Sequence, residues 1–294
     1  MGRIRIGVSG WRYTPWRGNF YPKKLAQSRE LQYAAGIFPS IELNGSFYSL
    51  QRPSSYAQWA AGTPPGFVFA VKRSRYITHM LRLRGIEAAL ANFFASGLFA
   101  LGDKLGPILW QFPPMLRFHP EVFEAFFQML PNSTHDAAKI ACRHDQRLEG
   151  RALLLPGRNR RIRHAVEVRH DSFVTPDFIQ LLRKYRIAWV VADTPKPWPL
   201  YEDVTADFVY IRLHGSTELY NSRYTTAELE RWARLIDAWR NGGEPEDARR
   251  ICPIRSRRRA GRDVYCYFDN TDKRHAPDNA RELMALLGVA AAPA

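Results

Sequence analysis

The chain has 294 residues, of which 46% are hydrophobic and 24% charged, and its formal net charge is +15. This hydrophobic share is ordinary for a globular protein that buries a core. The three cysteines (Cys142, Cys252 and Cys266) form no CxxC pair and no regular spacing, which suggests a reducing compartment rather than a disulfide framework.

The first residues, MGRIRIGVSG, lack the apolar region of a signal peptide. No apolar run approaches the roughly 20 residues of a membrane span. We therefore expect a cytoplasmic protein without a membrane partner.

Short β-rich runs alternate with stretches of helical periodicity along the chain. The predicted strands are 4–10, 40–48, 67–72, 106–112, 164–170, 187–193, 208–215 and 263–270. The predicted helices are 23–35, 54–61, 86–101, 120–130, 176–184, 226–240 and 276–287. The Pro-rich segment 196–207 is expected to hold only a short helical turn.

Strands that alternate with helices indicate parallel pairing through βαβ units. Eight such units favour a single α/β domain, a (β/α)8 TIM-type barrel of eight parallel strands with outer helices. The alternative is a doubly wound open sheet, but no GxGxxG or GxxxxGK[ST] loop follows a strand. We expect one domain over residues 1–288 and a flexible tail over 289–294.

The positive charge is concentrated in two segments. Residues 139–163 contain eight Lys/Arg and two acids, and residues 249–262 contain seven Arg and no acid, so together they carry 13 of the 15 net charges. Both segments lead from a helix into a strand, which places them at the N-terminal face of a barrel, opposite the usual active site. They are either solvated, partly disordered loops or a patch for nucleic acid or an acidic partner.

Polar residues gather where the predicted strands end, and in a barrel these ends converge on one mouth. The set is Glu42, Asn44, Lys72, His79, Gln111, Glu167, Arg169, Asp193, Arg212, His214, Asp269 and Asn270. Aromatic residues crowd the same loops, among them Trp11, Tyr48 and Tyr224. Such a set is either a buried ion-pair network or a polar binding or catalytic site.

The residue types suggest which chemistry the mouth could perform. Lys72, Arg169 and Arg212 are suited to clamp a carboxylate or phosphate. Glu167 or Asp193 would act as a general base, and His214 as an acid or base. Carboxylates and histidines could also hold a divalent metal, but no HExxH-like spacing occurs and the cations would oppose it. We therefore predict no metal and no other cofactor.

Eight ordered blocks of the sequence resemble the YecE-like barrel family, domain of unknown function 72. They are GVSGWRYTPWRGNFYP, IELNGSFY, FVFAVKRSRYITH, LGPILWQFPP, HAVEVRHDSF, VADTP, VYIRLHG with YNSRY after it, and VYCYFDN. The resemblance runs from residue 6 to about 286 and implies a TIM-like barrel with a polar pocket at the strand ends. It implies no reaction, and the two Arg-rich segments look like departures from it.

The leading hypothesis is a metal-independent enzyme with an anion-binding pocket and a small phosphate- or carboxylate-bearing substrate. A second hypothesis is a nucleic-acid-binding protein or endonuclease-like barrel that uses the basic loops and the aromatic residues. A third is a ligand-binding scaffold without turnover. The substrate, the reaction and the oligomeric state stay open.

Overall fold

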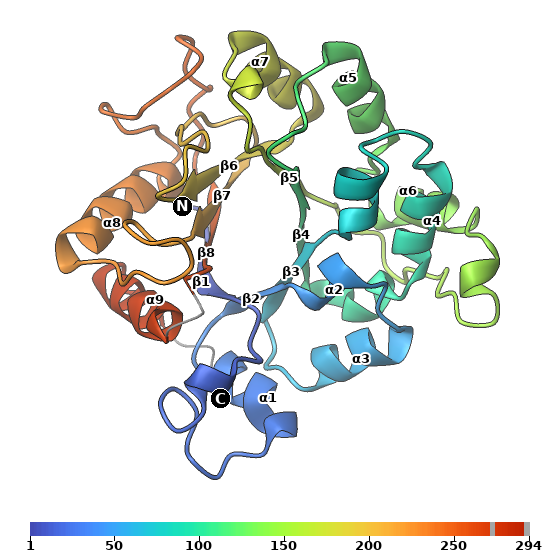
Figure 1. The fold of residues 1–294 in the computed structure, drawn as a ribbon, viewed down its shortest axis with the longest axis horizontal. Coiled ribbons are helices and arrows are strands. Elements are labelled where there is room, and N and C mark those ends of the chain that lie inside the picture. Colours follow the sequence, from blue (N-terminus) through green and yellow to red (C-terminus); the bar gives the residue numbers. More distant parts are fainter. Residues whose placement is uncertain (271–273, 291–294) are drawn as a thin grey trace.

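The computed structural model describes residues 1–270 and 274–290, and within them eight parallel strands close into a barrel in chain order (Figure 1). The strands are β1 (Ile4–Ser9), β2 (Ser40–Leu43), β3 (Val68–Lys72), β4 (Leu105–Gln111), β5 (His164–Glu167), β6 (Ala188–Asp193), β7 (Phe208–Leu213) and β8 (Asp263–Phe268). The predicted TIM-type barrel is therefore confirmed. Of the expected tail, residues 291–294 lie outside the described residues.

Helices surround the ring of strands (Figure 1). They are α1 (Glu30–Ala35), α2 (Gly45–Tyr48), α3 (Pro53–Ala61), α4 (Glu87–Ala95), α5 (Pro120–Met129), α6 (Thr134–Ala141), α7 (Pro176–Tyr185), α8 (Thr226–Arg240) and α9 (His275–Leu286). Proline occupies the first position of α3, α5 and α7, where its missing N–H is not needed. Thr225 and Glu228 form a reciprocal capping box at the start of α8.

Three local expectations were wrong. The second predicted strand, 40–48, ends at Leu43, because Asn44 already has helical dihedral angles and starts the turn into α2. Segment 196–207 holds no helical turn. Helix α6 was missed; the Ser133 side chain caps it by accepting from the backbone N–H of Asp136.

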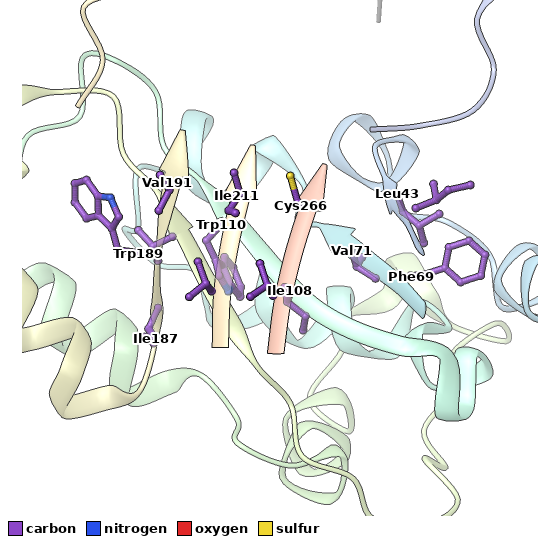
Figure 2. Close-up of a cluster of buried hydrophobic side chains, with 14 of the residues drawn as sticks. Leu43, Phe69, Val71, Ile108, Trp110, Ile187, Trp189, Val191, Ile211 and Cys266 are labelled. Atoms are coloured by element: carbon purple, nitrogen blue, oxygen red, sulfur yellow. The ribbon is translucent and has the colours of Figure 1, made fainter. Parts of the chain in front are cut away.

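The period of two along each strand separates two kinds of side chain. Val71, Trp110, Trp189, Val191 and Ile211 belong to the apolar layer between the strands and the helices (Figure 2). The alternate positions form a second apolar cluster inside the barrel, which includes Ala70, Leu109, Ala165, Val190 and Tyr210. Continuing this inner alternation to the strand ends brings polar residues of several strands into the mouth.

The opposite end of the barrel is closed by ion pairs. Arg163 lies 2.6 Å from Asp263 and 3.3 Å from Asp207, and the latter carboxylate also accepts from Arg161 at 2.6 Å. The two basic segments reach this end, just before β5 and β8, as predicted. No helix among the described residues is long and apolar enough to cross a membrane.

Candidate functional site

Arg212, near the end of β7, is the hub of the charged cluster in the barrel mouth. Its guanidinium lies 2.9 Å from Glu42, 2.6 Å from Glu167 and 2.8 Å from Asp269. The side chains of Arg212, Glu42 and Glu167 are fully buried. Burying ions is costly unless they are paired, and one arginine here pairs with carboxylates from three different strands.

Glu167 accepts from a second arginine as well. Arg169, two residues further along the chain, lies 2.8 Å from Glu167 and keeps 10% of its side chain exposed. Burial would raise the pKa of the Glu167 carboxyl, but Arg212 and Arg169 outweigh burial and hold that pKa well below its usual range. Glu167 is therefore ionised at neutral pH. Of the residues expected at the mouth, Arg169 and Arg212 thus both contact Glu167.

Glu42 is held by neutral groups in addition to Arg212. The Ser9 hydroxyl donates to one of its oxygens, and the Tyr210 hydroxyl donates to the other at 2.7 Å. The amide of Asn44 donates to Ser9 at 2.9 Å, so β1 joins this network of hydrogen bonds. Every oxygen of the Glu42 carboxylate thus has a donor, which fixes its position.

His214 lies beside the same hub. Its Nδ1 atom is 2.9 Å from Asp269, and its Nε2 atom is 3.3 Å from Nη1 of Arg212. An arginine can only donate, so Nε2 is the accepting atom in the contact with Arg212. Both ring nitrogens face protein groups, and the side chain is fully buried.

Lys72 differs from the other cations of the mouth. Among the described residues, no carboxylate lies within ion-pair distance of its amine, which stands 4.4 Å from the centre of the Phe47 ring. The side chain is 9% exposed. Burial, helped by the charge of Arg212, lowers the pKa of Lys72 from 10.5 to about 8.

His79 lies in the loop after β3 and reports the electrostatic potential of the mouth. Burial, together with the charges of Arg169, Lys72 and Arg75, lowers its pKa to about 4. Glu167 opposes these cations but does not outweigh them. Three cations thus lie close enough to His79 to disfavour its protonation, against one carboxylate. Gln111, at the end of β4, is buried with a side-chain oxygen that has no hydrogen-bond partner among the described residues.

Two aromatic side chains cover the cluster from loops. The Trp198 ring lies 3.7 Å from the guanidinium carbon of Arg169 and makes an edge contact with the His214 ring. Tyr220, whose φ of +61° is in the left-handed region, also makes an edge contact with the His214 ring. These rings exclude water from the hub, which strengthens the charge interactions beneath them.

Several predicted site residues lie apart from this cluster. The Asp193 carboxyl accepts from Tyr224 and Trp232, on the side of α8 rather than in the barrel mouth, and burial raises its pKa. Tyr224 is buried and also accepts from the backbone of Gly215 at 3.0 Å. Asn270 donates to Ser222 and Asn279, while Tyr48 is 71% exposed.

Trp11 lines a separate cavity of about 280 Å³ next to the mouth, together with Trp59, Asn44 and Gln51. Its ring packs edge-on against Trp59 and is 8% exposed, so it offers little open face for a stacked base. The Asn44 side-chain oxygen is buried without a partner among the described residues. Through Ser9, Asn44 connects this cavity to Glu42.

The carboxylates and histidines of the mouth do not form a metal-ligand set. In residues 1–270 and 274–290, no three His, Cys, Asp or Glu side chains converge in an arrangement that could hold a metal ion. The reason is visible in the contacts, because the oxygens of Glu42, Glu167 and Asp269 are directed at Arg212.

Sequence reasoning missed Ser9, Phe47, Trp198 and Tyr210. Of the two residues that it named at the end of β8, Asp269 is a member of the cluster and Asn270 is not. Period-two spacing could have found two of the missed residues. Ser9 ends β1 on its inner row, and Tyr210 lies two residues before Arg212 on the inner row of β7. Trp198 and Phe47 come from irregular loops, where no period applies.

The fold and this cluster define a TIM-type barrel protein whose charged groups lie at the C-terminal mouth, where barrel enzymes carry their active sites. The family model described as protein of unknown function DUF72 matches residues 5–294, and the chain belongs to this family.

The relatives agree with this assignment. The UPF0759 protein YunF of Bacillus subtilis is 24% identical, over 97% of this chain and 95% of that protein. A DUF72 family protein of Thermotoga maritima superposes with a TM-score of 0.71 at 24% identity, covering 97% of this chain and 99% of that one. A DUF72 family protein of Enterococcus faecalis gives a TM-score of 0.68 at 18% identity, covering 97% and 95%. These likenesses show the fold.

Proposed function

We propose that the barrel mouth is the active site of a metal-independent enzyme, which binds a small carbonyl compound bearing a carboxylate or phosphate. The Lys72 amine is the reacting group. The observation that carries this proposal is the state of Lys72, a nearly buried amine with a pKa of about 8 and no carboxylate partner among the described residues.

A lysine amine reacts with a carbonyl only in its neutral form, and burial beside another cation is a known way to favour that form. At pH 7 to 8 a substantial fraction of Lys72 is neutral, whereas an exposed lysine is almost fully protonated. The Nζ atom attacks the carbonyl carbon, a C=N bond forms and the carbonyl oxygen leaves as water.

The anionic group of the substrate is drawn to the His79 side of the mouth. Arg169, Lys72 and Arg75 supply three positive charges there. Arg169 has one face on Trp198 and bonds Glu167 through Nε and Nη2, which leaves its Nη1 to receive an anion. Neutral His79 supplies a further polar contact, and the free oxygen of Gln111 can accept a hydrogen bond from a hydroxyl group of the substrate, not from its anion.

This proposal changes the roles predicted from the sequence. Glu167, expected to be an acid or base, is a weak base because its pKa is so low, so it positions the arginines instead. His214 lies against Asp269 and Arg212, and we assign it to positioning Asp269. Asp193 has no part in the site.

Reductive trapping tests the proposal. The protein is incubated with pyridoxal phosphate, an aldehyde that carries a phosphate, and sodium borohydride is added before peptide mass spectrometry. We expect the adduct on Lys72, with loss of that adduct in Lys72→Arg and a weaker yield in Arg169→Gln. Lys196, an exposed lysine, serves as the internal control.

The same experiment with the uncharged aldehyde propanal separates the anion site from the amine. Arg169→Gln should leave labelling by propanal unchanged, because no anion is involved. Labelling of Lys72 that never exceeds that of Lys196 would remove the amine chemistry and favour the ligand-binding scaffold.

A further inference from the structure

The end of the barrel opposite the mouth has its own cavity, of about 530 Å³, at the N-terminal ends of β5 to β8. It is lined by six arginines and one acid, Asp207; the arginines are Arg161, Arg183, Arg186, Arg255, Arg257 and Arg259. Residues 254–259 of the Arg-rich segment form one wall, in the orange region beside α8 (Figure 1). The residues come from four separate connections, so the sequence does not show their convergence.

Most of these arginines have no carboxylate partner. Arg161 pairs with Asp207. Among the described residues, no carboxylate lies within 4 Å of Arg186, Arg255, Arg257 or Arg259. The Asp207 oxygen that accepts from Arg161 also accepts from Arg163. The cavity therefore carries an excess of positive charge that the protein does not neutralise.

Arg183 has a guanidinium nitrogen that lacks a hydrogen-bond acceptor among the described residues. Its Nε donates to the backbone of Val204 at 3.3 Å, and its Nη1 contacts the sulfur of Cys252 at 3.4 Å. Its Nη2 is buried and has no hydrogen-bond partner among the described residues. A guanidinium nitrogen left without an acceptor is costly, and an anion bound in the cavity would supply one.

The Arg-rich segment was expected to be either a solvated, partly disordered loop or a binding patch, and the structure shows it anchored. Asp203 accepts from the backbone N–H groups of Ile251 and Cys252 at 2.7 and 3.0 Å. Glu244 accepts from the backbone of Ser256 at 2.8 Å. Buried Arg262 donates to the carbonyls of Gly243 and Arg257.

The Arg-rich segment is also held by a close contact between the backbones of Arg259 and Gly242. The N–H of Arg259 donates to the carbonyl of Gly242 at 3.1 Å, and a Cβ at Gly242 would stand 1.8 Å from the Arg259 carbonyl oxygen. The segment is thus held at several points although it contains no helix or strand. Holding the arginines in place reduces the entropy lost when an anion binds.

We propose that this arginine cavity binds the phosphate backbone of a single-stranded nucleic acid, independently of the mouth. Arginine is the residue best suited to phosphate, since its planar fork donates two parallel hydrogen bonds. Exposed Arg258, between two arginines of the lining in the chain, adds charge beside the cavity, which suits a chain of phosphates better than a single one. The lining includes no aromatic residue, so contact is with the backbone and is independent of sequence.

The test is fluorescence anisotropy with a labelled 12-nucleotide strand of mixed sequence, between 50 and 200 mM salt. Six phosphate contacts give a slope of log K against log salt of roughly −4, so affinity should fall a few hundredfold across this range. In the variant with Arg255, Arg257 and Arg259 all changed to Gln, the slope should be about −2 and the fall about twentyfold.

The matched control removes the same charge from the other end. Arg82, Arg84 and Arg117 are exposed on loops that follow β3 and β4 and line a different cavity, and all three are changed to Gln. Equal melting temperatures of the two variants establish that both are folded. The proposal requires the control to keep the wild-type slope.

Three outcomes would overturn the proposal. They are no binding by the wild type, an unchanged slope in the Arg255, Arg257 and Arg259 variant, or an equal loss in the control. A fourth arm uses inorganic tripolyphosphate at the same phosphate concentration as the strand. If it displaces the strand completely, the cavity is a site for a small polyphosphate and not for a nucleic acid.

Discussion

The Nη1 atom of Arg212 lies 2.6 Å from Oε2 of Glu167, and neither side chain is exposed to solvent. This pair joins β5 to β7, two strands that are separated in the sheet by β6. The same guanidinium also holds Glu42 and Asp269. The interior of the mouth is thus assembled around one side chain.

Replacing Arg212 with Met should lower the free energy of unfolding by about 3–5 kcal/mol, because it leaves buried carboxylates without their partner. Urea unfolding at pH 7 measures the change. Arg147→Met is the control, since that residue forms an exposed pair with Asp145 whose loss should cost less than about 1 kcal/mol. Equal costs in the two variants would mean that the hub does not stabilise the barrel.

Glu167→Gln should destabilise the protein in a pH-dependent way. The pKa of Glu167 is lowered in the folded state, so its contribution is fully present above the unfolded value near 4.5 and is lost as the pH falls further. We expect a large difference in unfolding free energy between wild type and variant at pH 7. The difference should shrink below pH 4.5, and a constant difference down to pH 3 would contradict the assignment.

Lys72→Met should stabilise the protein at neutral pH. The lowered pKa means that folding opposes protonation of Lys72, a cost that is full below about pH 8 and disappears as the pH rises towards 10.5. The difference between 10.5 and about 8 corresponds to at most ~3 kcal/mol at pH 7. Unfolding in urea at pH 7 and pH 10 checks this, and the advantage of the variant should be much smaller at pH 10.

If Lys72→Met stabilises the fold, the result would also support a functional role for Lys72, because active sites often retain groups that lower stability. Lys72→Met that destabilises at both pH values would instead identify Lys72 as a packing residue of the barrel. This outcome is separate from the trapping experiment, which follows the reactivity of the amine.

Gly215→Ala should disturb the loop that carries Tyr220. Gly215 has a φ of +107°, and a Cβ there would stand 2.4 Å from the carbonyl oxygen of Glu218. We expect a loss of roughly 2 kcal/mol or more from the backbone strain and the clash. Gly85→Ala is the matched control, since its φ is +56° but nothing lies within 4 Å of the added Cβ. Thermal unfolding of both variants separates the clash from the strain.

The fold was readable from the sequence because each strand carries a short β-rich run and the helices between them have regular periodicity. The turn at Asn44 was not, since the apolar and aromatic residues of α2 read equally well as a continuing strand. Helix α6 runs into segment 139–163, whose charge was the dominant signal, and its Ser133 cap was the available clue.

The site residues that lie on strands could be predicted from the alternation of inward and outward side chains. Glu42, Lys72, Glu167 and Arg212 occupy inner positions near the strand ends, and the structure brings them together. Asp193 does not lie in the mouth, because it belongs to the outer row of β6, together with Trp189 and Val191. Which cation pairs with which acid depends on distances across the barrel, and no spacing along the chain encodes them.

The Arg-rich segment can change in sequence during evolution independently of the barrel mouth. Strands of about six residues span roughly 20 Å, so the arginine cavity lies about that far from the mouth. Substitutions at this separation usually have additive effects on the free energy of unfolding. A descendant could exchange every arginine of residues 255–259 without altering Lys72 or Arg212. The two ends of one barrel can therefore be inherited, lost or refined as separate traits.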